Sequence, residues 1–226
     1  MTDDHFQKIY AGPQTDWYDE MVSCEDVAGH FRDFIRARVK GLCLLDVGAG
    51  TGRVSRIASP VARQVLTTDL NLPMLRTAKS TDPGLMIAAG DALHLPIRKG
   101  WAEVIVAGWA LGHFVGWFAD WRARIGYALD EMNRVTAPAG AQIIVETLGT
   151  GFAEPAPPTE GLAAYYALLE SEYSFVRHTL RTDYRFPDVA TGARLVGFFF
   201  GDELAQRLID EDSRDLIEWT GVWVRS

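Results

Sequence analysis

Short apolar runs alternate with amphipathic stretches along most of this chain. A nearly unbroken apolar run over 43–47 leads into a glycine-rich loop, and a helix-capable stretch comes next at 53–62. Apolar runs of this length are typical of strands that are buried on both faces of a parallel sheet. The pattern therefore predicts an α/β fold. Further runs of strand length recur at 64–68, 85–89, 103–107 and 141–146.

Amphipathic stretches between these runs predict the helices. The stretch before residue 43 carries Phe31, Ile35 and Val39 at helical spacing, and Gly41 stands where a helix would end. Asn71 can cap a helix whose first turn accepts a proline. A longer stripe predicts a buried helix face that ends before a turn at 138–140. That stripe consists of Trp121, Ile125, Ala128, Leu129, Met132 and Val135.

The composition changes most clearly at 149–158, which is rich in glycine, alanine and proline. The rest of the chain is too short and too regular for a separate domain, so we expect a single domain over 1–226. The later elements are predicted as a helix at 162–173, a strand at 175–186, a helix at 189–210 and an edge strand at 216–224.

The loop after the first strand places glycines at Gly48, Gly50 and Gly52. Glycine adopts positive φ without steric cost and lets a ligand approach where a Cβ would collide. Asp69 ends the second strand, 21 residues after Gly48. Ligands of open α/β sheets bind beyond the carboxyl ends of the strands, where this acid can accept hydrogen bonds from two ribose hydroxyls. The sequence thus predicts a nucleoside-containing ligand, although the loop lacks the dinucleotide spacing G-x-G-x-x-G.

The loop sequence L-D-V-G-A-G-T-G at 45–52 resembles the nucleotide loop of the class I S-adenosylmethionine-dependent methyltransferases, of the small-molecule, methyltransferase-11-like type. Further segments resemble that family in the same order and cover about half of the chain. They are the ribose segment at 69–75, the adenine segment at 90–96, the fourth strand at 102–107, and the helix and turn at 131–140.

This resemblance implies a Rossmann-like three-layer sandwich with a mostly parallel seven-stranded sheet and an antiparallel last strand. It implies S-adenosyl-L-methionine as the cofactor. It also divides the expected domain into an N-terminal lid and helix at 1–42, a cofactor-binding half at 43–147, and an acceptor side with the C-terminal strands at 148–226.

The resemblance also implies roles for individual residues. Asp69 would bind the ribose hydroxyls, and Asp46 would brace the loop or meet the amino end of the methionine. For Asp91 we favour a bond to the adenine amine over a turn cap. Tyr10 and Tyr18 can touch the methionine end or simply pack. The expected cofactor-binding residues are Tyr18, Asp46, Gly48, Ala49, Gly50, Thr51, Gly52, Asp69, Leu70, Met74, Gly90, Asp91, Ala92, Leu93, Gly108 and Trp109.

The segment after the fourth strand borders the reaction centre in that family. His113 is the residue in it that exchanges a proton near neutral pH, so we name it as the candidate catalytic residue. It would act as a general base or orient the acceptor; the alternative is that it holds the loop or the cofactor. Trp109 and Trp117 belong to an aromatic group that can line an acceptor pocket, which favours an apolar or aromatic acceptor.

Charge and composition narrow the classes of partner. The net charge is −8, from 22 basic and 30 acidic residues, and works against a large nucleic-acid surface. The family's nucleic-acid amino-methylating members carry Asn/Asp-Pro-Pro-aromatic after the fourth strand, whereas this chain reads A-G-W-A at 107–110.

The histidines lack ligand spacing, so no metal is expected. Cys24 and Cys43 imply no disulfide framework. The N-terminal residues lack a signal-peptide pattern and no stretch is long enough to span a membrane, so we expect a cytoplasmic protein.

The sequence thus favours a methyltransferase (EC 2.1.1.-) that moves a methyl group to a small-molecule acceptor by direct in-line transfer. Its alternatives are methylation of a macromolecule, protein or RNA, and a non-catalytic regulator that binds S-adenosylmethionine. A nicotinamide-dependent oxidoreductase would use the same sheet and acid, but its glycine fingerprint is missing from the loop. Neither the acceptor nor the oligomeric state can be derived from the sequence.

Overall fold

A mixed sheet forms the centre of the molecule, and the computed structural model describes residues 15–226. The sheet has seven strands in the order β3-β2-β1-β4-β5-β9-β6. Neighbours from β3 to β5 are parallel, whereas β9 is antiparallel to both β5 and β6. The expected Rossmann-like α/β fold is confirmed. The strands are β1 (Cys43–Val47), β2 (Gln64–Asp69), β3 (Met86–Ala89), β4 (Ala102–Gly108), β5 (Thr136–Thr150), β6 (Val176–Arg181) and β9 (Glu218–Arg225).

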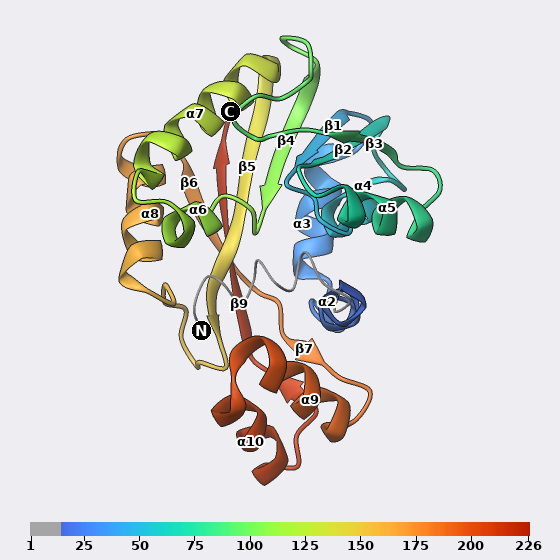
Figure 1. The fold of residues 1–226 in the computed structure, drawn as a ribbon, viewed down its shortest axis with the longest axis vertical. Helices are drawn as coiled ribbons and strands as arrows, with labels where there is room; N and C mark the ends of the chain where they lie inside the picture. The colour runs from blue at the N-terminus through green and yellow to red at the C-terminus, as the bar shows by residue number, and fades with distance from the viewer. Residues whose placement is uncertain (1–14) are drawn as a thin grey trace.

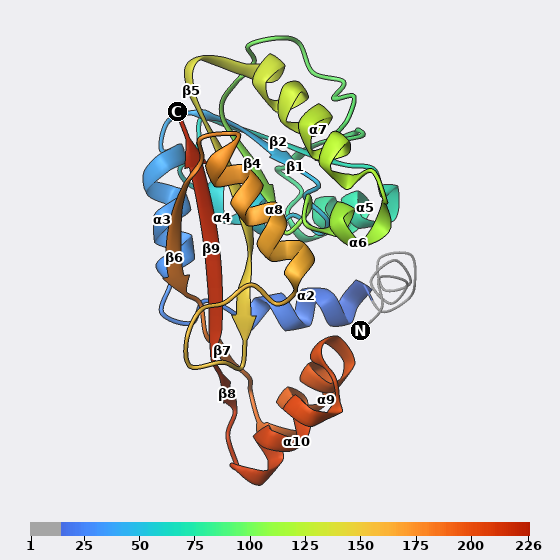
Figure 2. The ribbon, with the colours of Figure 1, turned by 90° about the vertical axis from the view of Figure 1, so that its left-hand side faces the viewer.

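Helices cover both faces of the sheet and make it the middle of three layers (Figure 1, Figure 2). On one face, Phe31 of α3, Val54 of α4 and Ala78 of α5 join a single apolar cluster with the strands. On the other, Leu129 of α7 and Tyr165 of α8 belong to a second cluster, against which the short helix α6 also packs. The helices are α3 (His30–Val39), α4 (Arg53–Ala58), α5 (Leu72–Thr81), α6 (His113–Trp117), α7 (Trp121–Val135) and α8 (Glu160–Ser171).

Local sequence explains where several helices begin. The Asn71 carboxamide oxygen accepts the Met74 N–H at 3.2 Å, so the predicted cap of α5 is confirmed. Thr159 caps α8 in the same way, through the Leu162 N–H at 3.1 Å. Such caps satisfy N–H groups that the first helical turn leaves unpaired.

A small lobe, made of β7, β8, α9 and α10, extends beyond the sheet, and α2 lies between the two (Figure 1, Figure 2). A third apolar cluster fills this lobe and includes Met21 of α2. Trp17 and Tyr18 of α2 pack edge-on against Phe198 and Phe199 of α9, with ring centroids 5.0 and 6.2 Å apart. The elements are α2 (Thr15–Ser23), β7 (Tyr184–Arg185), α9 (Val189–Phe200), α10 (Asp202–Asp210) and β8 (Asp215–Leu216).

Several boundaries predicted after residue 135 are wrong. The expected strand at 175–186 is two strands, because β6 pairs with β9 in the main sheet while β7 pairs with β8 in the small lobe. The expected helix at 189–210 breaks at Gly201, whose φ of 102° no helix permits. β9 is an interior strand, and β6 takes the edge. The expected turn at 138–140 lies inside β5, which bends there with a register shift against β4.

The carboxyl ends of the parallel strands meet at one edge of the sheet. β1 lies between β2 and β4, so Val47 stands beside Thr68 and Ala107. The chain leaves β1 and β4 toward opposite faces, which opens a crevice where such sheets bind ligands. Among the described helices, none combines the length and apolar character that a membrane span requires.

Candidate cofactor and acceptor site

A pocket of about 440 Å³ opens in this crevice, beyond the ends of β1, β2 and β4. It brings together most of the residues singled out in the sequence. A second cavity, of about 370 Å³, lies at the opposite end of the sheet beside Asn133 and Arg225 and contains none of them. The predicted residues that line the pocket are Tyr18, Asp46, Gly48, Ala49, Gly50, Asp69, Leu70, Met74, Gly90, Asp91, Ala92, Gly108, Trp109 and His113.

Three predicted cofactor-binding residues, Thr51, Gly52 and Leu93, do not line this pocket. Thr51 is buried and its hydroxyl donates to Asp19 of α2, while Gly52 caps α4 with its Cα facing Ala78. Tyr10 lies outside the described residues. The pocket residues that the cofactor prediction did not include are Arg53, Val54, Asn71, Ala110, Leu111, Phe114 and Trp117.

The glycine loop requires glycine for two separate reasons. Gly48 and Gly50 have φ values of 65° and 56°, in the left-handed region that side chains disfavour. A Cβ on Gly48 would lie 2.6 Å from the Ala110 Cβ, and one on Gly50 would lie 3.2 Å from the Met74 Cε. The loop therefore packs tightly against the segment that follows β4, with its backbone exposed to the pocket.

Gly48→Ala is expected to lower the free energy of unfolding by about 2 kcal/mol, because it adds both backbone strain and overpacking. Gly41→Ala is the matched control, since Gly41 has φ 75° but a Cβ on it would have no atom within 4 Å. Gly41→Ala should lower the free energy of unfolding only by the backbone strain, about 1 kcal/mol. Urea denaturation of both variants measures the difference, and equal losses would show that the Ala110 contact is unimportant.

Asp69 ends β2 with both carboxyl oxygens held by backbone groups. The Gly50 N–H donates to Oδ2 and the Asn71 N–H donates to Oδ1, each at 2.7 Å. Burial raises the pKa of this carboxyl, and the N–H bonds oppose that shift. Each oxygen of an ionised carboxyl accepts more than one hydrogen bond, so the group keeps capacity for ligand hydroxyls.

Asp46 is buried beneath the glycine loop and ties β1 to the start of α4. Its Oδ2 accepts the Ser55 N–H at 2.9 Å and the Ser55 hydroxyl at 2.7 Å. Its Oδ1 is buried and makes no hydrogen bond within the part of the chain that the structure describes. Burial raises the pKa of Asp46 to about 7. One oxygen therefore braces the fold while the other is left for a donor.

The adenine segment predicted from the sequence forms one wall of the pocket. The Asp91 Oδ1 accepts the Leu93 N–H at 2.9 Å, so this carboxyl caps a turn as well as lining the pocket. Leu70 lines the same pocket but is 74% exposed, so no protein core covers it. An exposed apolar side chain at a pocket rim is available to cover a flat ligand.

Arg53 is a pocket residue that the sequence analysis missed. Its guanidinium pairs with Glu25 at 2.8 Å and stacks on the Trp109 ring, 3.9 Å from the centroid. The arginine and glutamate side chains are only 12% and 3% exposed. A cation in the first turn of a helix opposes the helix dipole. The position of Arg53 directly after Gly52, at the start of a helix, is therefore the signal in the sequence that Arg53 requires an acidic partner.

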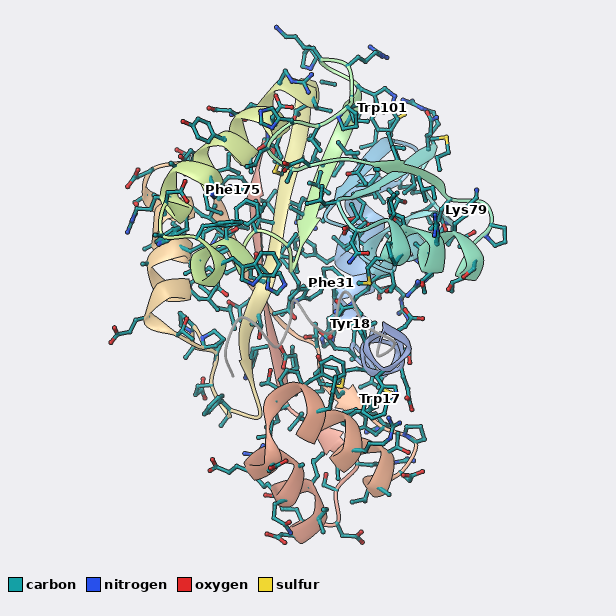
Figure 3. All side chains as sticks on the ribbon, viewed as in Figure 1. Trp17, Tyr18, Phe31, Lys79, Trp101 and Phe175 are labelled. Carbon is teal, nitrogen blue, oxygen red and sulfur yellow. The ribbon has the colours of Figure 1, made fainter. Side chains whose placement is uncertain are left out.

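Helix α2 closes the side of the pocket next to the small lobe. Tyr18 extends from α2 toward the edge of the sheet at which Phe31 also lies (Figure 3). Burial raises the pKa of the Tyr18 hydroxyl, so it stays protonated. The neighbouring Asp19 accepts from Thr51 at 3.1 Å and pairs with Arg56 at 2.8 Å. These contacts attach α2 to the end of the glycine loop.

The opposite wall is formed by the segment between β4 and α7. Trp109 has φ 50°, a strained value for a bulky residue, and its N–H donates to the Val145 carbonyl at 2.7 Å. His113 begins α6, and its ring stacks on Trp117 with centroids 4.8 Å apart. The structure thus brings the candidate catalytic histidine and two tryptophans to the lining of one pocket, with Trp117 on α6 and the Trp109 ring packed against Phe31 and Arg53.

Comparisons with known proteins agree with this geometry. Residues 45–144 match the family described as "Methyltransferase domain". A malonyl-[acyl-carrier protein] O-methyltransferase of Yersinia pestis is 28% identical over 134 residues, which are 59% of this chain and 47% of that protein. A demethylmenaquinone methyltransferase of Paenarthrobacter aurescens is 31% identical over 118 residues, 52% of this chain and 42% of that protein. The chain therefore spans less than half the length of these curated relatives.

A solved structure shares the fold. The TehB-like SAM-dependent methyltransferase from Corynebacterium glutamicum aligns with a TM-score of 0.54 at 19% identity, covering 95% of this chain and 96% of that one. The sheet order and this likeness define a Rossmann-like fold. Residues 45–144 are therefore similar to that methyltransferase family, and this similarity supports a class I S-adenosylmethionine-dependent methyltransferase.

Proposed function

We propose that this protein transfers a methyl group from S-adenosylmethionine to a small-molecule acceptor by direct in-line transfer. The observation that carries the proposal is the convergence of the glycine loop, Asp69 and Asp91 on one pocket at the strand ends. The family supports the cofactor, and the names of the relatives support the reaction type.

The residues of the pocket fit this cofactor. The volume of about 440 Å³ lies within the range of small-molecule sites, about 300–1,000 Å³. In the proposed arrangement, Asp69 accepts the ribose hydroxyls, Asp91 faces the adenine amine and Leu70 covers an adenine face. The Oδ1 of Asp46, to which no described residue donates, would accept from the ammonium group of the methionine portion. Arg53, which pairs with Glu25, also lines the pocket and carries the charge that would match the methionine carboxylate.

The chemistry requires positioning more than covalent catalysis. When bound, S-adenosylmethionine supplies a methyl group that its sulfonium makes electrophilic. The protein has to hold the acceptor in line with that group, and such orientation alone can supply about 7–11 kcal/mol of the barrier. His113 faces the pocket, where its imidazole would orient the acceptor or take its proton.

The lining favours an apolar or aromatic acceptor. Phe114 and Trp117 of α6 line the pocket together with Trp109. The net charge of −8 works against a polyanionic substrate. One matched relative is named for demethylmenaquinone, which is consistent with a small acceptor.

A protein-borne acceptor is the second candidate, because the other relative is named for a malonyl-[acyl-carrier protein]. The cofactor pocket would be the same in both cases, and the acceptor would arrive attached to a carrier. Transfer of radioactive methyl from S-adenosylmethionine to free small molecules, but not to carrier-linked forms of them, favours the first candidate. A regulator would bind the cofactor without transferring methyl to either.

A thermal-shift titration tests the cofactor assignment. A ligand that binds only the folded state raises its stability by about 2.7 kcal/mol at a hundred times its dissociation constant. We expect S-adenosylmethionine and S-adenosylhomocysteine to raise the Tm by about 5–10 °C at that concentration. NADH and NADPH at equal concentrations are the controls and should leave the Tm unchanged. Stabilisation by the nicotinamide ligands alone would contradict the proposal.

A further inference from the structure

A buried carboxyl group lies directly behind the α6 wall of the pocket. Glu146 follows Val145 on β5, and the Val145 carbonyl already holds Trp109 at the pocket. The Glu146 side chain is 5% exposed, and its Oε1 accepts the Gly112 N–H at 2.8 Å. Neither Glu146 nor Gly112 lines the pocket, so this contact supports the wall from behind.

Gly112 has no conformational reason to be glycine. Its φ and ψ are −58° and −27°, which any residue adopts. A Cβ at this position would lie 2.7 Å from the Glu146 Oε2, closer than Cβ atoms approach other atoms. The absent side chain at Gly112 therefore makes room for the Glu146 carboxyl, and the two residues form a matched pair.

This pair sets the beginning of α6. His113 follows Gly112 directly and is the first residue of a helix that ends at Trp117. None of the side chains of α6 is fully buried, and a helix this short is not stable on its own. The position of the stacked His113 and Trp117 rings therefore depends on how the start of the helix is anchored as well as on its packing against the second apolar cluster.

The surroundings of Glu146 favour its neutral form. The titratable groups that face it are Tyr165 and Tyr166 of α8. The Tyr165 hydroxyl is fully buried beside the carboxyl and makes no hydrogen bond of good geometry with any described residue. Burial raises the pKa of Glu146 to about 8, against the opposing effect of the Gly112 N–H. A neutral carboxyl still accepts the Gly112 N–H through its carbonyl oxygen.

We propose that Glu146 is a positioning residue of this site, which holds the start of α6 and thereby fixes His113 and Trp117 in the wall that faces the acceptor. The inference rests on the proposed methyl transfer only in calling the ligand that faces this wall a methyl acceptor. The anchoring itself follows from the Gly112 contact and the absence of room for a side chain there.

The test observes the His113 ring by NMR in protein labelled with ¹⁵N-histidine, with His113→Gln used to assign its signals. Glu146→Gln keeps a neutral acceptor for the Gly112 N–H, so the His113 signals should stay close to those of the wild type. Glu146→Ala removes the acceptor and should move them. In the wild type the His113 signals should also change near pH 8, as Glu146 ionises, and this change should be missing in Glu146→Gln.

Glu131→Ala is the matched control, because Glu131 accepts the Leu95 N–H at 2.8 Å and anchors a different loop. It should leave the His113 signals in place. If Glu146→Ala does not fold, Gly112→Ala replaces it, since a methyl group 2.7 Å from the Glu146 Oε2 forces α6 or the carboxyl to shift and so disturbs the anchoring contact. Unchanged His113 signals in the folded Glu146→Ala or Gly112→Ala variant, or equal changes in Glu131→Ala, would overturn the proposal.

Titration of the same samples with S-adenosylhomocysteine separates this inference from the proposed function. If the wild type does not bind this ligand, the cofactor assignment fails while the NMR result still decides the role of Glu146. If the ligand binds and the His113 signals do not change in the Glu146 variants, the cofactor assignment stands and the proposed anchoring role of Glu146 fails.

Discussion

Asp69→Ala should raise the dissociation constant for S-adenosylhomocysteine by about 100-fold or more. The carboxylate would accept both ribose hydroxyls, and a hydrogen bond to a charged group contributes about 1.5–3 kcal/mol. Together, two such bonds contribute more than the roughly 2.8 kcal/mol of binding free energy that a hundredfold change in the dissociation constant represents. Isothermal titration calorimetry at a fixed pH measures the change directly.

The control for this variant has to separate ligand binding from loop geometry, because Asp69 also holds Gly50 and Asn71. Asp82→Ala removes a carboxyl that anchors a turn after α5 and does not line the pocket. It should leave the affinity unchanged. Asp69→Ala should keep the circular dichroism spectrum of the wild type, which shows that the fold survives. Undiminished binding in a folded Asp69→Ala protein would remove Asp69 from the site.

Arg53→Met is expected to lower the free energy of unfolding by about 3–5 kcal/mol, because it leaves a buried carboxylate without its partner. Glu25 is the carboxylate, with its side chain 3% exposed and its Oε2 2.8 Å from Arg53. For a chain of this size, each kcal/mol corresponds to about 2–4 °C of Tm, so the Tm should fall by about 6–20 °C. Differential scanning calorimetry measures the loss.

A double mutant shows whether the loss comes from the unpaired charge. Arg53→Met combined with Glu25→Gln removes both charges, so it should recover most of the stability lost in Arg53→Met alone. Arg185→Met is the surface control, because Arg185 and Asp215 pair at 2.7 Å with half of each side chain exposed. It should cost less than about 1 kcal/mol. If the double mutant is as unstable as Arg53→Met, the stacking on Trp109 matters more than the ion pair.

The cofactor half of the fold could be predicted from sequence because its signals are local. The apolar run of β1, the glycine loop and Asp69 each follow from a few neighbouring residues, and the topology of parallel strands brings them together. Positive φ at Gly48 and Gly50 and the Asn71 cap were expected on the same grounds and are found. Local chemistry therefore determines most of the residues that line the pocket.

The remaining features depend on partners far apart in the chain. Glu25 reaches Arg53 from the segment after α2, and Glu146 reaches Gly112 from the next strand of the sheet. Apolar alternation over 175–186 predicted a strand but could not indicate that its two ends join different sheets. The helical pattern over 189–210 continued through Gly201, because hydrophobic periodicity does not register the backbone conformation of one residue. Such features are set by tertiary pairing rather than by local propensity.

Within the described part of the chain, helix α2 contacts the glycine loop on one side and the small lobe on the other, both through specific contacts. Asp19 binds the end of the glycine loop, while Trp17 and Glu20 bind α9 through Phe198 and Arg194. A rigid helix held from both sides cannot move away from one neighbour without disturbing its contacts with the other. Displacement of the small lobe and rearrangement of the glycine loop are therefore energetically coupled through α2.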